Sequence, residues 1–226
     1  MKTLNFICND EKLEFNYDKC FAIGYAGRNI EKTKEHIDEL ERDLGVKPPK
    51  FIPTIFECSK EIVTQDSDLK FVGERTSGEC EYVILLAEDE IYITVGSDHT
   101  DRDLESVNIF KSKQVCLKPL AKEAWKYDEV KDHWDDIKLN SYTTVDGKEV
   151  LYQEGTLGDI LPVEKILSEL EKRIGDVKNS VIFSGTVPTK DGFVFGDDFR
   201  AELIDEILNR KIEFKYYVNV IAEDER

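Results

Sequence analysis

Three carboxylates occupy positions that a single β-hairpin would bring together: Glu79, Glu81 and Asp98. Glu79 and Glu81 are two residues apart, so on a strand their side chains point to the same face. Residues 79–86 and 91–96 are both rich in β-forming side chains, and a short polar segment separates them. This pattern predicts a β-hairpin, although its turn lacks the usual Gly or Asn.

The expected register of this hairpin decides which side chains meet. With the turn centred after Glu88, Asp98 faces Glu79 and Gly96 faces Glu81. Directly opposed residues share one face of a sheet, so the three carboxylates would form one patch. Because glycine has no side chain, we expect Gly96 to leave room beside Glu81 for an ion and a substrate.

A patch of this kind has a specific chemistry. Three anions side by side repel one another unless a cation lies between them, and ligation by oxygen alone suits Mg²⁺, Mn²⁺ or Ca²⁺. The alternative is an exposed acidic strand face. Val83 and Leu85 alternate with Glu81 on the same face, which indicates that this face turns inward. The pattern therefore predicts a metal-dependent enzyme.

The composition excludes some classes of partner. The chain has 226 residues with 40% hydrophobic content, enough for a sizeable core. Its formal charge of −17 argues against binding to nucleic acid or to anionic membranes, because both are recognised through Lys and Arg. Five widely spaced cysteines without a CxxC pair, and the lack of a signal-peptide pattern, predict a cytoplasmic protein with reduced thiols.

Other patterns place elements around the hairpin. Helical spacing of apolar residues predicts a helix that follows the turn at 27–29 and stops at Gly45, and a second helix follows Pro162 over about 163–173. After Asp98 comes a charged segment with no assigned structure. Strands are expected within 1–24, 51–75, 137–144, 149–152, 180–183 and 211–221, and residues 119–134 look loop-like with short helical turns.

Together these elements predict a strand-dominated α+β fold, a mixed β-sandwich or roll with a few helices. We expect one catalytic domain over residues 1–226. Within it, residues 1–50 would supply strands and a lid-like helix, and residues 51–226 would form a β-rich metal-binding core.

Four blocks of the sequence resemble the fumarylacetoacetate hydrolase superfamily, in particular its C-terminal catalytic domain. Residues 79–81 resemble the Glu-x-Glu metal pair of that family, and residues 97–105 are similar to its Asn-Asp-Val-Thr-Ala-Arg-Asp-Leu-Gln motif. Residues 146–156 resemble a block in which a Gly turn leads to Gln, Gly and Thr. Residues 184–186 resemble a Thr-Gly-Thr strand end near the substrate. The blocks occur in family order over roughly residues 20–190.

The resemblance implies a fold of the fumarylacetoacetate hydrolase type, a homodimer, and Mg²⁺ or Mn²⁺ held by the three carboxylates. It also implies a small 2-oxo or β-dicarbonyl acid as substrate. Members of the family perform C–C hydrolysis, decarboxylation or tautomerisation. A divalent ion suits this chemistry, because it can chelate neighbouring oxygens and stabilise a metal-bound enolate.

The resemblance also assigns roles to single residues. The family places a Lys after the Asp motif to neutralise developing charge, and Lys111 and Lys113 both fit that description. Gln153 would orient a water or a substrate oxygen. Thr186, with the adjacent Gly185 backbone, would hold a substrate carboxylate.

The sequence departs from the family pattern at the residues that activate water. Hydrolytic members carry a His–Glu pair near the first helix, but these positions fall on Thr33 and His36. His36 could form a shifted version of the pair with a neighbouring Glu, or it could simply flank the helix. Arg28 could bind an anionic substrate or pair with a surface acid. Arg102 could touch substrate, or join Asp101 and Asp103 in a buried ion network that supports the metal ligands.

Two functions therefore remain open at this point. The first is a divalent-metal-dependent hydrolase or lyase acting on a small oxo acid. The second is a non-catalytic metabolite-binding or structural protein that has kept the fold, which the missing His–Glu pair motivates.

Overall fold

The computed structural model describes residues 1–44 and 47–222, and two sheets dominate it. The six-stranded sheet contains, in spatial order, β12 (Trp125–Lys126), β9 (Ile91–Ser97), β8 (Cys80–Leu86), β15 (Ser180–Phe183), β3 (Lys19–Gly24) and β4 (Thr54–Cys58). The five-stranded sheet contains β14 (Lys148–Thr156), β13 (Lys138–Val145), β16 (Asp198–Asp205), β17 (Arg210–Ile221) and β6 (Asp68–Val72).

Smaller elements complete the chain. Three short pairings are β1 (Lys2–Cys8) with β2 (Glu11–Tyr17), β5 (Val63–Thr64) with β11 (Lys118–Pro119), and β7 (Thr76–Ser77) with β10 (Thr100–Asp101). The α-helices are α1 (Ile30–Leu44), α2 (Arg102–Val107), α3 (Ile109–Val115), α4 (Tyr127–Val130) and α5 (Val163–Arg173). Short 3₁₀ turns are η1 (Lys60–Ile62), η2 (Lys131–Asp136) and η3 (Leu157–Asp159). This strand-dominated α+β architecture confirms the predicted fold class.

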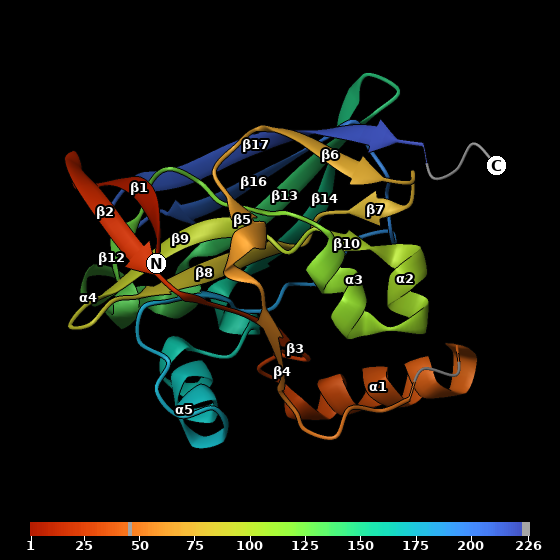
Figure 1. Cartoon of the computed structure of the whole chain (residues 1–226), viewed down its shortest axis with the longest axis horizontal. Helices are drawn as coiled ribbons and strands as arrows, with labels where there is room; N and C mark the ends of the chain where they lie inside the picture. The colour runs from red at the N-terminus through yellow and green to blue at the C-terminus, as the bar shows by residue number, and fades with distance from the viewer. Residues whose placement is uncertain (45–46, 223–226) are drawn as a thin grey trace.

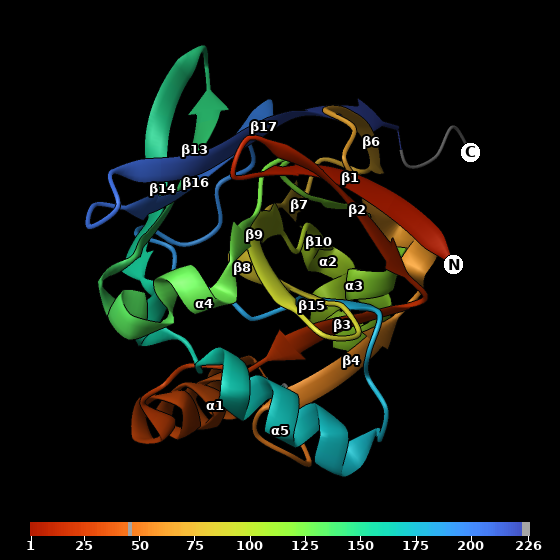
Figure 2. The ribbon, with the colours of Figure 1, turned by 90° about the vertical axis from the view of Figure 1, so that its left-hand side faces the viewer.

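The elements lie in layers. In Figure 1 the five-stranded sheet forms the upper layer, β8 and β9 lie beneath it, and α1 and α5 lie below those strands. Figure 2 shows the turn between β13 and β14 projecting from the upper layer. That turn falls at Asp146 and Gly147, as predicted, and both residues have positive φ. The helices α2 and α3 lie beside β10 (Figure 1).

The central strand β8 divides its side chains between two cores. Tyr82 and Ile84 pack into the larger core, which also receives side chains from the five-stranded sheet such as Leu203. Val83 and Leu85 belong to the second core, under the β1–β2 hairpin. Alternation along a strand explains this division, because successive side chains point to opposite faces. Both faces of β8 are therefore buried.

The hairpin β8–β9 has the predicted register. Glu81 pairs with Gly96 and Leu86 pairs with Ile91, so the turn is centred after Glu88 as expected. The two helices predicted from apolar spacing are also confirmed, as α1 and α5.

Helices α2 and α3 were not predicted, and neither were the two-residue strands β7, β10, β11 and β12. The charged segment after Asp98 forms α2 and α3, which are only 6 and 7 residues long. Each is started by a side-chain cap, because Asp101 accepts a hydrogen bond from the N–H of Leu104 and Asn108 accepts one from Lys111. Helices this short carry too little periodicity to be recognised. Strand β16 was missed as well.

The expectation that Gly96 leaves room for a ligand is wrong. A Cβ added at Gly96 would lie 2.6 Å from Leu120 Cδ2 and 2.9 Å from Val83 Cγ2, with Phe183 at 3.0 Å. The space above this glycine is therefore filled by apolar side chains of the second core. Gly96 serves close packing rather than ligand access.

This packing makes a testable prediction. We expect Gly96→Ala to lower the free energy of unfolding by about 1–3 kcal/mol, the usual cost of overpacking a core. Denaturant unfolding followed by fluorescence would measure it. In a Leu120→Ala background, which removes the nearest atoms, the added cost of Gly96→Ala should shrink. An equal cost in both backgrounds would contradict the packing explanation.

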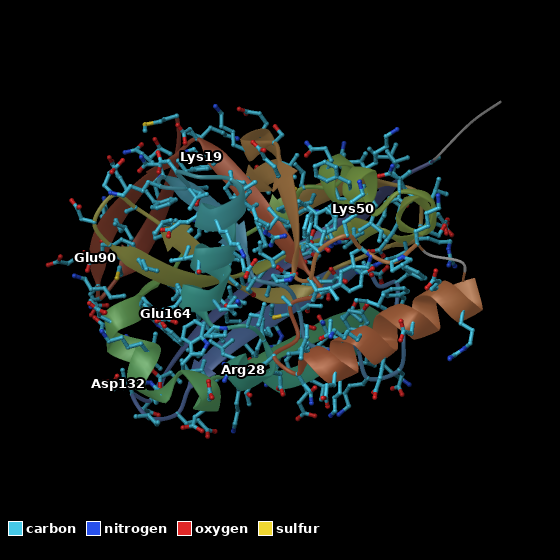
Figure 3. All side chains as sticks on the ribbon, turned by 90° about the horizontal axis from the view of Figure 1, so that it is seen from below. Lys19, Arg28, Lys50, Glu90, Asp132 and Glu164 are labelled. Atoms are coloured by element: carbon cyan, nitrogen blue, oxygen red, sulfur yellow. The ribbon has the colours of Figure 1, made fainter. Side chains whose placement is uncertain are left out.

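Among the described residues, no helix combines the length and the apolar character needed to cross a lipid bilayer. Charged side chains of both signs, including Lys19, Lys50, Glu90 and Glu164, cover the face shown in Figure 3. The high charge of the chain is thus largely a solvated surface.

Candidate active site

The three carboxylates singled out in the sequence meet at one end of the β8–β9 hairpin. Glu79 precedes β8, Glu81 lies on it, and Asp98 follows β9. The Asp98 N–H donates to the Glu79 carbonyl at 3.0 Å, which extends the hairpin register by one pair. One oxygen from each of the three side chains lies within 4.8 Å of the others. Glu81 and Asp98 are almost fully buried.

Three cations contact these carboxylates. The ammonium of Lys113 lies 2.5 Å from Asp98 Oδ2 and 3.3 Å from Glu79 Oε2. The ammonium of Lys118 lies 2.7 Å from Asp98 Oδ1. The guanidinium of Arg102 lies 3.1 Å from Glu79 Oε1. Opposite charges at these distances strongly favour each other's ionised form inside a protein.

The pKa directions follow from this arrangement. Burial raises the pKa of Glu81 well above its usual range, and the neighbouring Asp98 raises it further. Burial alone would raise the pKa of Asp98 too, but Lys113 and Lys118 outweigh it and hold the pKa of Asp98 low. In the same way Lys113 and Arg102 outweigh burial and lower the pKa of Glu79. Asp98 and Glu79 thus favour their ionised forms, while Glu81 favours its neutral form.

The structure distinguishes the two candidate lysines. Lys113 is buried and bonded to two of the carboxylates, whereas Lys111, two residues earlier on α3, is exposed. On a helix, residues two apart point in different directions. Helix α3, absent from the sequence prediction, therefore decides which of the two lysines reaches the carboxylates.

Lys118 was missed by sequence reasoning. It lies on β11, has no exposed side-chain surface, and donates to the carbonyl of His99 at 2.5 Å as well as contacting Asp98. A lysine is rarely buried without a partner, but the sequence has no feature that names the partner. The structure buries Cys116 and Leu120, two residues before and after Lys118, and the apolar character of these two neighbours is a sequence feature consistent with a buried Lys118.

Gln153 uses its whole amide to hold the strand that carries the two glutamates. Its Oε1 accepts hydrogen bonds from the Cys80 N–H and the Ser141 hydroxyl, each at 2.9 Å. Its Nε2 donates to Thr186 Oγ1 at 2.7 Å and to the Val187 carbonyl at 2.6 Å. Because Cys80 lies between Glu79 and Glu81 in sequence, Gln153 fixes the backbone between them. Its predicted contact with water or substrate would require one of these bonds to break.

Thr186 and Gly185 approach β8 from the end of β15. The Thr186 hydroxyl donates to the Cys80 carbonyl at 2.7 Å, and the Gly185 N–H donates to Glu81 Oε2 at 3.0 Å. Gly185 has φ of 93°, and a Cβ there would lie 2.7 Å from the Cβ of Ala26. Glycine is needed at this position both for its backbone conformation and for the close approach. Both residues contact strand β8 or the Glu81 side chain that it carries, and a substrate role for them stays a prediction.

Arg102 supports Glu79 rather than joining its two sequence neighbours. Besides Glu79, it pairs with Glu105 at 2.8 Å and donates through Nε to Ser77 Oγ at 2.8 Å. Asp101 caps α2 instead, and Asp103 pairs with the exposed Arg75. The expected ion network therefore exists, but Glu79 and Glu105 are its acids, and not Asp101 and Asp103.

Arg28 is engaged by protein groups. It pairs with Asp135 at 2.6 Å and donates to the carbonyls of Ile160 and Leu157 at 3.1 and 3.3 Å. Figure 3 shows Arg28 beside the N-terminal end of α1. These bonds tie the start of α1 to the segment before α5. Of the two alternatives for Arg28, the pairing with an acid is the one present here.

The residues at the family's water-activating positions lie on α1. The Thr33 hydroxyl donates to the Asn29 carbonyl at 3.1 Å, within the first turn of the helix. The side chain of His36 lies outside the described part of the structure, so its predicted role stays open. His99 is fully buried; its Nδ1 is 2.8 Å from the Tyr216 hydroxyl, and its ring stacks on Phe71 at 3.8 Å. His99 thus acts as a packed neighbour of Asp98.

Tyr25 is a further residue that sequence reasoning missed. It has φ of 54°, a backbone conformation that non-glycine residues seldom adopt. Burial raises the pKa of its phenol, as does Glu105, while Lys113 lowers it. Such outliers cluster at functional sites. The effects of Glu105 and Lys113 on its pKa place Tyr25 near this site, in the connection between β3 and α1.

The donor set fits a divalent metal ion. Octahedral Mg²⁺ with bonds of about 2.1 Å needs ligand oxygens roughly 3–4 Å apart, and one oxygen from each of these three carboxylates lies within 4.8 Å of the others. Asp98 Oδ1 is buried, and the Lys118 ammonium lies 2.7 Å from it. All the donors are hard oxygen atoms, which suit Mg²⁺ or Mn²⁺. Glu79, Glu81 and Asp98 are the residues that would hold it.

Solved structures with the same fold include enzymes that act on oxo acids. Cg1458 with inhibitor matches with a TM-score of 0.64 and 16% identity over 92% of this chain and 78% of that chain. 2-Keto-3-deoxy-D-arabinonate dehydratase complexed with magnesium and 2,5-dioxopentanoate matches with a TM-score of 0.61 and 15% identity, over 92% of this chain and 74% of that chain. Fumarylacetoacetate hydrolase from psychrophilic Exiguobacterium antarcticum matches with a TM-score of 0.57 and 17% identity, over 92% of this chain and 76% of that chain. The chain therefore has the fumarylacetoacetate hydrolase fold, as predicted.

Sequence comparison adds the family. No curated protein matches the chain. The model of one family, described as a protein of unknown function (DUF2848), matches residues 23–216, which include most of both large sheets and all three carboxylates. The chain belongs to the DUF2848 family, and its fold is that of the fumarylacetoacetate hydrolases.

Proposed function

We infer that this protein is a divalent-metal-dependent enzyme that acts on a small 2-oxo or β-dicarbonyl acid. The observation that carries this proposal is the triad of Glu79, Glu81 and Asp98, of which the last two are buried; one oxygen from each lies within 4.8 Å of the others. A divalent ion bound there would polarise substrate oxygens and stabilise the negative charge that develops beside a carbonyl. The named substrate of one structural neighbour, a 2-keto acid, supports the substrate class.

The protein's own residues supply positioning and charge. Lys118, which also donates to the His99 carbonyl, fixes Asp98, and Gln153 fixes the backbone between the two glutamates. Lys113 brings a positive charge to the carboxylates, where it can meet an anionic substrate. Together these groups hold the ligands and one cation in place before substrate arrives, which lowers the cost of reorganisation.

The reaction subtype follows from what stands at the water-activating positions. Thr33 occupies the family's His position, and its hydroxyl is bonded within its own helix. A threonine has no titration near neutral pH with which to activate water. This favours enolisation or decarboxylation over C–C hydrolysis. A homodimer in the cytoplasm remains the expected setting.

One observation favours a second candidate, a metabolite-binding protein without catalysis. Lys113, Lys118 and Arg102 already compensate the carboxylates, so the triad can persist without a metal. The two candidates differ in turnover. Only an enzyme of the proposed kind would speed a bond-breaking step next to a carbonyl.

The proposal predicts metal-dependent ligand binding and proton exchange. We expect MgCl₂ or MnCl₂ to raise the melting temperature, and oxalate, which mimics an enolate, to raise it further only when metal is present. We also expect metal-dependent exchange of the α-protons of pyruvate in deuterated water, followed by NMR. Stabilisation without exchange of any enolisable oxo acid tested would support the binding protein. If millimolar metal did not raise the melting temperature, that result would contradict both the metal site and the proposed enzyme.

A further inference from the structure

Lys113 has an unusual position relative to the three carboxylates. Its ammonium bridges two of them, at 2.5 Å from Asp98 Oδ2 and 3.3 Å from Glu79 Oε2. The other oxygen of each carboxylate, called the outer oxygen below, is engaged by a different cation, Lys118 on Asp98 and Arg102 on Glu79. The ammonium therefore lies where a cation shared by the carboxylates would lie.

The other two cations hold the outer oxygens and are fixed by further partners. Lys118 contacts Asp98 Oδ1 and also donates to the His99 carbonyl. Arg102 contacts Glu79 Oε1 and is held as well by Glu105 and by the hydroxyl and carbonyl of Ser77. Both have anchors that remain when a metal arrives.

Lys113, by contrast, is bonded through its ammonium to the two carboxylates themselves. It reaches them on a four-carbon stem from the short helix α3, and its ring neighbour Phe56 is 6.0 Å away. A flexible stem with its polar bonds only at the tip can swing without breaking backbone structure. Lys113 is therefore the cation of this group best able to move.

A divalent ion and this ammonium cannot share the same oxygens. Each is positively charged, and inside a protein two cations a few ångströms apart repel strongly. The carboxylate oxygens also have few free lone-pair directions, since Arg102 and Lys118 already use the outer ones.

We propose that Lys113 occupies the metal position in the metal-free protein and that metal binding displaces its ammonium from Asp98 and Glu79. This proposal rests on the metal site of the proposed function. It gives Lys113 two successive roles. Without metal, Lys113 keeps the carboxylates of Asp98 and Glu79 from repelling each other. With metal, its freed ammonium is available to the carboxylate or oxo group of the substrate.

The main test compares Mn²⁺ affinity in matched lysine variants. Lys113→Met removes the competing ammonium, and Lys111→Met removes the same charge from the exposed face of the same helix. We expect Lys113→Met to bind Mn²⁺ at least tenfold more tightly than wild type, measured from the EPR signal of free Mn²⁺, and Lys111→Met to differ by less than twofold. Equal or weaker binding by Lys113→Met would overturn the proposal.

The wild-type protein provides a second test that does not depend on the folding of a variant. Acetylation of lysines by a water-soluble reagent, mapped by mass spectrometry, should rise at least threefold at Lys113 when MgCl₂ is added and stay constant at Lys111. No change at Lys113, in protein that binds Mn²⁺, would overturn displacement while leaving the metal-dependent enzyme standing. If neither wild type nor Lys113→Met binds Mn²⁺, the proposed function fails together with this inference.

Discussion

Glu81→Gln is expected to abolish divalent metal binding while leaving the metal-free fold intact. Glu81 is almost fully buried, and the described residues give its carboxylate one hydrogen-bond donor, the Gly185 N–H at 3.0 Å. A glutamine oxygen can accept the same bond. Burial together with the neighbouring Asp98 and Glu79 favours the neutral form by raising the pKa of Glu81, so a neutral isostere costs little. The variant should therefore melt at or above the temperature of the metal-free wild type.

Metal binding should respond in the opposite way. Loss of a group that hydrogen-bonds to a metal ligand typically lowers metal affinity by about 10–100-fold. Loss of a direct anionic ligand should therefore lower it by more than about 100-fold. Thermal unfolding with and without MnCl₂ measures both effects on the same samples. The combination of an unchanged metal-free protein and a lost metal shift identifies Glu81 as a ligand. If the variant bound metal as tightly as wild type, Glu81 would not be a metal ligand, and the proposed three-carboxylate site would be wrong.

Asp98→Asn should produce the largest loss of stability of any single substitution at the site. Asp98 is almost fully buried between Lys113 and Lys118, whose ammonium groups lie 2.5 and 2.7 Å from its two oxygens. Asparagine keeps the shape but removes the charge that compensates them. Removal of one partner of a buried ion pair typically costs about 3–5 kcal/mol, because the other charge is left uncompensated. We expect a loss in that range from urea unfolding in the absence of metal.

A double-mutant cycle separates this explanation from a general loss of packing. Lys118→Met should also destabilise the protein, because Asp98 then loses one of its two counter-charges. When both substitutions are combined, the buried charges that remain are better balanced, so the loss should be smaller than the sum of the two single losses. Contacting residues show coupling of about 0.5–3 kcal/mol in such cycles. Strict additivity would show that the ion pair contributes no coupling at this site.

Local sequence patterns were sufficient for the elements built from long or regular segments. The register of the β8–β9 hairpin followed from two β-rich runs and the polar segment between them, because the two-residue period fixes which side chains are opposed. Helices α1 and α5 followed from apolar spacing. The meeting of Glu79, Glu81 and Asp98 is a consequence of that register alone, since all three lie on one hairpin.

The cations around the carboxylates could not be predicted in this way. Lys118 comes from β11 and Lys113 from α3, and both reach Asp98 only because their elements pack against the end of the hairpin. Sequence spacing left Lys111 and Lys113 equivalent. The difference between them depends on the orientation of a 7-residue helix whose start is set by the cap at Asn108.

The roles of neutral residues also depended on tertiary contacts. Gln153 and Gly96 were expected to serve a ligand, but the amide of Gln153 is fully bonded to protein groups, and the space at Gly96 is filled by Leu120 and Val83. Apart from Val83, which lies on the same hairpin as Gly96, these partners come from other elements of the fold. The sequence by itself therefore determined the hairpin and its three acids, because these depend on local periodicity. Which cations neutralise those acids, and where space remains, were decided by long-range packing that no local pattern encodes.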